Sequence, residues 1–174
     1  LNKEMKNFAE NKEFEKAARI RDRIQNIESI LEKQKISDPN QTDKDIINYT
    51  SNFGKIFFNL FQVRDGKLIN QENFIFNGEV QEDEESGKEA LESFLTQYYE
   101  KTTNIPKEIL IPHEPTDKKE MEIFLTEQKG SKVNILIPER GQKSKLLELS
   151  LKNAKVFAER NSTSWQEESD QTKE

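Results

Sequence analysis

The stretch IFFNLFQVRDGKLINQENFIF, residues 56–76, decides the fold class of this chain. Its first part, Ile56–Val63, is rich in aromatic and β-branched residues, which is typical of a buried strand. The Asp65-Gly66 pair that follows is a common two-residue turn of a β-hairpin. A returning strand is then expected over Lys67–Phe76, and a shorter one over Asp45–Asn52. The sequence therefore predicts an antiparallel meander of three strands.

Helices and strands alternate after this meander. Residues 86–100 have the spacing of an amphipathic helix, residues 108–112 and 133–138 are short apolar runs, and further helices are expected from Thr116 and from Gln142 to about Arg160. Two short apolar strands separated by a helix predict a parallel βαβ unit. The order is therefore βββαβαβα, which is the order of a ribonuclease H-like α/β (α+β) domain with a mixed sheet.

We expect this domain to cover residues 45–160, with a polar tail or linker over 161–174 and helix over 1–36. Leu1, Met5 and Phe8 share one helical face, and a second apolar stripe starts at Phe14, so a helical hairpin is predicted. About 35 residues cannot enclose a core. Because residues 37–44 resemble a linker, docking of the hairpin on a partner is favoured over docking on the chain itself.

The composition excludes several classes of protein. The chain has 174 residues, a net charge of −6 and no cysteine, which excludes a disulfide scaffold, a thiol nucleophile and a Cys-based zinc site. No apolar window approaches the roughly 18 residues of a membrane span. We therefore expect a soluble cytoplasmic protein. Since the helical pattern is already present at Leu1, we also expect the chain to be a fragment of a longer protein.

Acidic residues do not form a convincing metal site. Active ribonuclease H-like enzymes hold two Mg²⁺ ions with carboxylates on the first strand, the first helix and the end of the fourth strand. The corresponding regions here offer Asp43, Asp45, Glu89, Glu92, His113 and Glu114. We interpret the acids as solvated surface residues and the lone histidine as structural, so no metal, cofactor or catalytic residue is expected. A metal-dependent nuclease would require Asp45, Glu89 or Glu92, and Glu114 to converge.

A basic cluster lies where the last short strand leads into the last helix, and it comprises Lys132, Arg140, Lys143 and Lys145. Backbone amides at a helix N-terminus together with nearby bases can bind phosphate groups. Such contacts would follow the DNA backbone and would be independent of sequence. The alternative is that this loop is rich in Gly and Lys for geometric reasons alone.

Residues 1–24, LNKEMKNFAENKEFEKAARIRDRI, resemble the UVR motif. The matching positions are Leu1, Met5, Ala9, Phe14, Glu15, Ala17, Ala18, Arg21, Asp22 and Ile24. The motif occurs in the damage-verifying helicase and in the nuclease of bacterial nucleotide excision repair, and in some stress-response adaptors. The following segments, including VRDGKLINQENF and PERGQKSKLLELSLKNA, resemble the nuclease of excinuclease ABC, which is the UvrABC system protein C family. The resemblance covers about residues 1–158.

This resemblance implies a function. In that family the UVR hairpin pairs with the C-terminal UVR hairpin of the helicase subunit, and Phe14 matches its central contact, flanked by Glu15, Ala17, Ala18, Arg21 and Asp22. The middle domain lies between the two nuclease domains that incise damaged DNA on both sides of the lesion. The resemblance therefore implies a recruitment and scaffold segment without incision residues. The alternative is a UVR-containing regulatory adaptor, although such adaptors usually carry Cys-rich zinc clusters.

Overall fold

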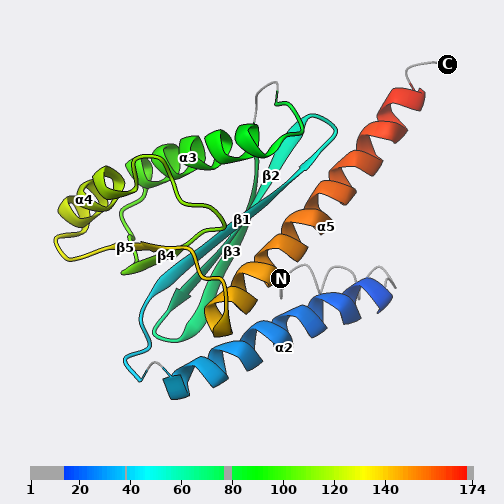
Figure 1. Cartoon of the computed structure of the whole chain (residues 1–174). Coiled ribbons are helices and arrows are strands. Elements are labelled where there is room, and N and C mark those ends of the chain that lie inside the picture. The colour runs from blue at the N-terminus through cyan, green and yellow to red at the C-terminus, as the bar shows by residue number, and fades with distance from the viewer. Residues whose placement is uncertain (1–13, 38, 77–79, 172–174) are drawn as a thin grey trace.

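The computed structural model describes residues 14–37, 39–76 and 80–171, and a five-stranded mixed sheet lies at its centre. The strands are β1 (Lys44–Asn52), β2 (Lys55–Arg64), β3 (Lys67–Phe76), β4 (Glu108–Leu110) and β5 (Asn134–Leu136). Their order in the sheet is β3-β2-β1-β4-β5. The first three strands are antiparallel, and β4 and β5 run parallel to β1 (Figure 1). This arrangement confirms the predicted meander and βββαβαβα order.

Tight turns connect the three meander strands. Phe53-Gly54 and Asp65-Gly66 both have positive φ at each residue, which is the conformation that a two-residue hairpin requires. The register of β2 against β3 shifts between Gln62 and Val63, so a β-bulge precedes the second turn. Extra twist at such a bulge helps the hairpin to follow the curvature of the sheet. The Asp-Gly turn was predicted from the sequence, and the bulge was not.

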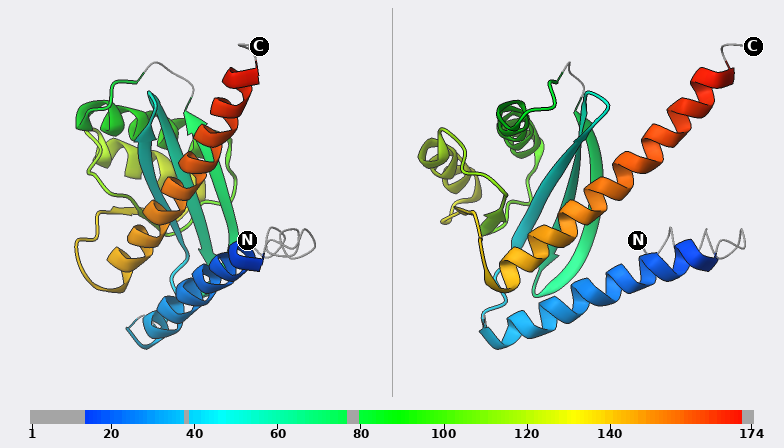
Figure 2. Two further views of the ribbon diagram at one scale, coloured as in Figure 1. Left: turned by 90° about the vertical axis from the view of Figure 1, so that its right-hand side faces the viewer. Right: turned by 45° about the vertical axis from the view of Figure 1, so that its right-hand side comes forward.

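Helices cover both faces of the sheet. Helices α3 (Glu84–Lys101) and α4 (Lys118–Lys129) lie on one face, whereas α5 (Gly141–Gln171) crosses the other face beside α2 (Phe14–Ser37) (Figures 1 and 2). Helix α3 starts where the Asp83 carboxylate accepts a hydrogen bond from the Ser86 amide at 2.7 Å. None of the helices in these described ranges is long and apolar enough to span a membrane.

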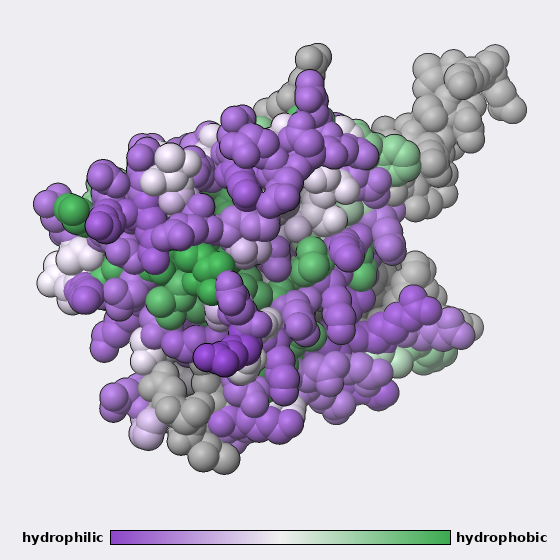
Figure 3. Space-filling view, in the orientation of Figure 1, coloured by the Kyte–Doolittle hydropathy of each residue, from purple (hydrophilic) through white to green (hydrophobic). Residues whose placement is uncertain are grey.

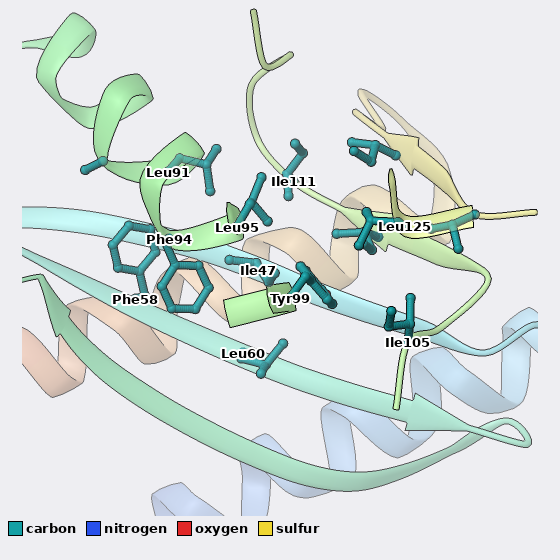
Figure 4. Packing of buried hydrophobic residues seen from close by; sticks show 14 of the residues in the cluster. Ile47, Phe58, Leu60, Leu91, Phe94, Leu95, Tyr99, Ile105, Ile111 and Leu125 are labelled. Carbon is teal, nitrogen blue, oxygen red and sulfur yellow. The ribbon is translucent and has the colours of Figure 1, made fainter. Parts of the chain in front are cut away.

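Two apolar clusters form the core, one on each face of the sheet. Strand β2 is buried along most of its length and contributes to both. The cluster under α3 stacks the Phe58 and Phe94 rings, whose centroids lie 4.4 Å apart, and continues through Leu60, Leu95 and Tyr99 (Figure 4). The cluster under α5 contains Ile46, Phe61, Val63 and Leu146. By contrast, hydrophilic residues cover most of the face seen in Figure 3, and an apolar patch appears on it near β4 and β5.

The structure differs from the sequence prediction at both ends of the domain. Helix α2 is continuous to Ser37, and its Ile27 and Leu31 side chains are only 1% and 5% exposed within the cluster under α5. This half of the helix is therefore part of the core, rather than an independent module behind a linker. Helix α5 ends at Gln171 instead of near Arg160. The first helix of the predicted hairpin, within residues 1–13, lies outside the described residues.

Candidate functional site

The UVR-like residues occupy the N-terminal half of α2, and this half is exposed. Phe14 is 67% exposed, so its ring does not pack on the ribonuclease H-like domain. Glu15, Arg21 and Asp22 are exposed too, and Ala17 and Ala18 are half-buried. Arg21 Nε lies 4.0 Å from Asp22 Oδ1, which is a loose pair in open solvent. We call the surface formed by these six residues the UVR face.

The UVR face and the buried stripe lie on different sides of α2. Successive helical residues are about 100° apart, so Phe14 and Ile27 point in directions about 140° apart. Ile27 and Leu31 pack on the domain, and Arg23 Nη1 donates to Asn153 Oδ1 of α5 at 3.5 Å. In the view of Figure 2 (right) the N-terminal half of α2 diverges from α5. One helix thus combines an anchored half with an exposed half.

Asp45 is not the solvated surface acid that we expected from the sequence. Its side chain is completely buried, and Asp45 Oδ1 lies 2.8 Å from Arg64 Nη1. Its second oxygen, Oδ2, accepts a hydrogen bond of 2.7 Å from the Tyr99 hydroxyl. Burial raises the pKa of Asp45, and the nearby Arg64 charge opposes that rise. Burial also raises the pKa of Tyr99 well above its usual value, and the Asp45 charge adds to the effect.

The Arg64 side chain extends this polar cluster at the end of the sheet where β1 begins and β2 ends. Its Nη1 also donates to the backbone carbonyls of Lys44 at 3.2 Å and Val63 at 3.0 Å. Its Nε and Nη2 donate to the Asn104 side chain and carbonyl, which lie beyond α3. The cluster therefore ties together β1, β2 and the α3–β4 connection. No role is assigned to Arg64 from the sequence alone, because its partners are brought near only by the fold.

The acids considered for a metal site do not come together. Asp45 pairs with Ile109 in the middle of β4, whereas Glu114 lies four residues after Leu110, at which that strand ends. Glu92 Oε1 accepts a hydrogen bond from the Thr116 amide at 2.6 Å, and Asp43 Oδ1 accepts one from the Asp65 amide at 2.8 Å. In the part of the chain that the structure describes, no group of three metal-ligating side chains is assembled.

His113 lies after β4, packed against an aromatic side chain. Its ring centroid is 5.9 Å from that of Tyr49, and burial lowers its pKa, with a smaller contribution from the Lys88 charge. Gly87 of α3 lies so close to the Tyr49 ring that an added Cβ would be 2.7 Å from the Tyr49 hydroxyl. The lone histidine is thus part of a close contact between β1, α3 and the β4–α4 loop.

The predicted basic cluster is present, although one of its members is already paired. Lys132, Arg140 and Lys145 are exposed around the connection from β5 to α5. Lys143 Nζ, in contrast, lies 2.9 Å from Glu108 Oε2 at the start of β4. Its charge is therefore partly neutralised within the protein. Three of the four bases remain available at the surface.

Comparison with known proteins identifies the family. Residues 43–161 match the family model described as "UvrC Ribonuclease H-like domain", and residues 1–30 match the "UvrB/uvrC motif". The chain belongs to the UvrC family. It is 37% identical over 174 residues to UvrABC system protein C of Alkaliphilus oremlandii, covering all of this chain and 28% of the relative. The corresponding protein of Clostridium perfringens strain SM101 is 41% identical over 157 residues, which are 90% of this chain and 25% of that protein.

The chain spans about a quarter of the length of the curated relatives it matches. Among solved structures, a chain of the PCNA–RNase HII complex from Archaeoglobus fulgidus aligns with 72% of this chain and 77% of its own length, at a TM-score of 0.45 and 14% identity. The UVR match ends at Ile30, within α2. The motif therefore includes both the exposed UVR face and Ile27, which packs on the ribonuclease H-like domain.

Proposed function

We propose that this segment recruits UvrC, as the nuclease of bacterial nucleotide excision repair, to the helicase subunit of the excinuclease through the UVR face. The observation that carries the proposal is the exposure of Phe14 on a helix whose other half is anchored in the core. A large apolar side chain that its own domain leaves in solvent is available to a partner. The match of residues 1–30 to the UvrB/uvrC motif supports a partner in the same repair system.

The energetics suit a small interface centred on one aromatic residue. Burying a fully exposed Phe side chain contributes about 1.5–3 kcal/mol. Interfaces of this kind depend on a few buried anchors, and the surrounding polar residues exclude water and contribute less. Phe14 is the anchor in this proposal, and the exposed Arg21 and Asp22 lie at the rim.

Calorimetric titration of this chain with the excinuclease helicase tests the proposal. Phe14→Ala should weaken binding about 10- to 100-fold, because it removes about 1.4–2.8 kcal/mol of the binding free energy. Phe53→Ala is the matched control, since Phe53 is 63% exposed but lies in the β1–β2 turn, away from α2. It should leave the affinity unchanged. An equal loss in both variants, or no binding by the unmodified chain, would exclude recruitment through the UVR face.

We also propose that this segment acts as a scaffold and does not itself cut DNA. Asp45 is paired with Arg64 and Tyr99, and Glu92 supports the loop before α4. Incubation with lesion-containing DNA and Mg²⁺ or Mn²⁺ should therefore give no cleavage product. Metal-dependent cleavage that disappears in Asp45→Asn would instead support the nuclease interpretation. The match over residues 43–161 favours a UvrC scaffold over a UVR-containing regulatory adaptor.

Contact with DNA phosphates at the β5–α5 connection completes the proposed role. The exposed bases Lys132, Arg140 and Lys145 support it. Replacing all three with Gln should weaken DNA binding and make the slope of log K against log salt less steep by about 2–3 units. A control variant with the same change of charge replaces three other exposed lysines, namely Lys101, Lys107 and Lys119. An identical salt slope in the two variants would contradict this contact.

A further inference from the structure

An open groove of about 620 Å³ lies between α3 and α4, on the sheet face opposite α2 and α5. Apolar side chains from both helices line it, among them Leu95 of α3 and Met121 and Phe124 of α4. Leu95 and Leu125 line the groove and also belong to the buried cluster that Figure 4 shows. This volume is within the range of sites that hold several side chains or a small ligand. We call it the α3–α4 groove.

Apolar surface is exposed at the α4 side of this groove. Phe124 is 39% exposed and lines the groove, and the neighbouring Ile123 is 59% exposed. Leu125, the next residue, is buried in the core. Of these three consecutive apolar residues, one is buried in the core and two have exposed surface. The exposed parts of the Ile123 and Phe124 side chains are available to another molecule.

The charge of the groove has a single sign. Among the described residues that line it, four are acidic and none is basic; the acids are Glu89, Glu92, Glu100 and Asp117. Glu92 is bonded to the Thr116 amide, whereas the other three are exposed. Like-signed carboxylates around an apolar floor repel phosphate groups and attract Lys and Arg. The groove is therefore unsuited to nucleic acid and complementary to a basic protein segment.

We propose that the α3–α4 groove binds a basic amphipathic segment of a protein partner. An apolar side chain of that segment packs against Phe124 and Met121, and its Lys or Arg residues pair with Glu89, Glu100 and Asp117. The UVR face lies on the α2–α5 side of the sheet, so the two surfaces can be occupied at the same time (Figure 2). The proposal does not depend on recruitment through α2.

A defined probe tests this groove in the 174-residue chain. The probe is a fluorescein-labelled synthetic helix of leucine and lysine, and its binding is followed by anisotropy; the same helix with glutamate in place of lysine is the charge control. Residues that contact the probe are located by amide chemical shifts of the ¹⁵N-labelled chain. We expect saturable binding of the basic helix, shifts confined to α3 and α4, and binding of the acidic helix at least about tenfold weaker.

Two variants with matched controls separate the groove from general charge attraction. Neutralising Glu89, Glu100 and Asp117 to their amides should weaken binding about tenfold or more, whereas the same change at three exposed acids outside α3 and α4 should have an effect below about twofold; those acids are Glu28, Glu139 and Glu148. Phe124→Ala should weaken binding, and Ile69→Ala on β3 should not.

Three results would overturn the proposal. The first is an equal loss of affinity in the groove and control variants. The second is a set of shifts centred on α2 or α5 instead of α3 and α4. The third is concentration-dependent shifts at the α3–α4 groove without any probe, which would show that a second copy of the chain occupies it.

Discussion

Arg64→Leu is expected to be among the most destabilising substitutions in this domain. Arg64 and Asp45 form an ion pair at 2.8 Å, with side-chain exposed fractions of 12% and 0%. Leucine keeps the apolar part of the side chain but leaves the Asp45 carboxylate buried without a counter-charge. Breaking a buried pair from one side costs about 3–5 kcal/mol of the free energy of unfolding.

A substitution of Asp45, the other residue of the ion pair, provides a control for this loss of stability. Asp45→Asn removes the buried charge and keeps an oxygen that can accept the Tyr99 hydroxyl bond. The double variant should therefore be more stable than Arg64→Leu alone. It still lacks the bonds from Arg64 to the Lys44 and Val63 carbonyls, each of which contributes about 0.5–1.5 kcal/mol. We expect the double variant to lose about 1–3 kcal/mol.

Urea unfolding at pH 7, followed by circular dichroism, measures both quantities. With a slope of about 2 kcal/mol per molar urea, Arg64→Leu should lower the midpoint by about 2 M. The double variant should recover at least half of that difference. A shift of less than about 0.5 M in Arg64→Leu, or a double variant no more stable than the single one, would refute the reasoning about the buried charge.

Three further predictions concern stability. Burial raises the pKa of Asp45 in the folded state above its ordinary value of 3.8. The stabilisation that results from this raised pKa is complete below pH 3.8 and is lost as the pH rises through the raised pKa. Urea midpoints measured from about pH 3.5 to 7 should therefore vary less in Asp45→Asn than in the unmodified chain. Leu31→Ala should cost about 2–5 kcal/mol and accelerate hydrogen exchange in α2 more than in α3, whereas uniform acceleration would contradict the local anchoring of α2. Gly87→Ala places a Cβ 2.7 Å from the Tyr49 hydroxyl and should cost about 1–3 kcal/mol; thermal unfolding should show a smaller cost in a Tyr49→Leu background, and an equal cost would argue against this contact.

The meander and the alternating elements could be predicted because their signals are local. Ile56–Val63 is apolar almost throughout, and its turn needs the positive φ that Asp-Gly adopts easily. The predicted strand Lys67–Phe76 has the same bounds in the structure. Helix α5 was predicted too short because residues after Arg160 are rich in Ser, Thr, Gln and Glu. Gln and Glu are good helix formers, so this composition does not by itself end a helix.

The buried cluster at Asp45 could not be predicted because its partners are distant in sequence. Arg64 is 19 residues away and Tyr99 is 54 residues away. A carboxylate at the start of a strand has no local signal that separates burial from exposure. The docking of α2 was missed for a different reason: Ile27 and Leu31 have the same helical spacing whether they pack on the chain or on a partner.

Because helix α2 is continuous, the direction in which Phe14 points depends on the number of helical residues between Phe14 and Ile27. With Ile27 fixed in the core, one alanine inserted after Asp22 would rotate Phe14 by about 100° around the helix axis and shift it by about 1.5 Å along that axis. Four inserted alanines would shift it by about 6 Å along the axis but change the direction in which it points by only about 40°. In the proposed complex, a partner held rigidly relative to the sheet would be more sensitive to the single insertion than to the fourfold one. A partner on a flexible tether would not distinguish them.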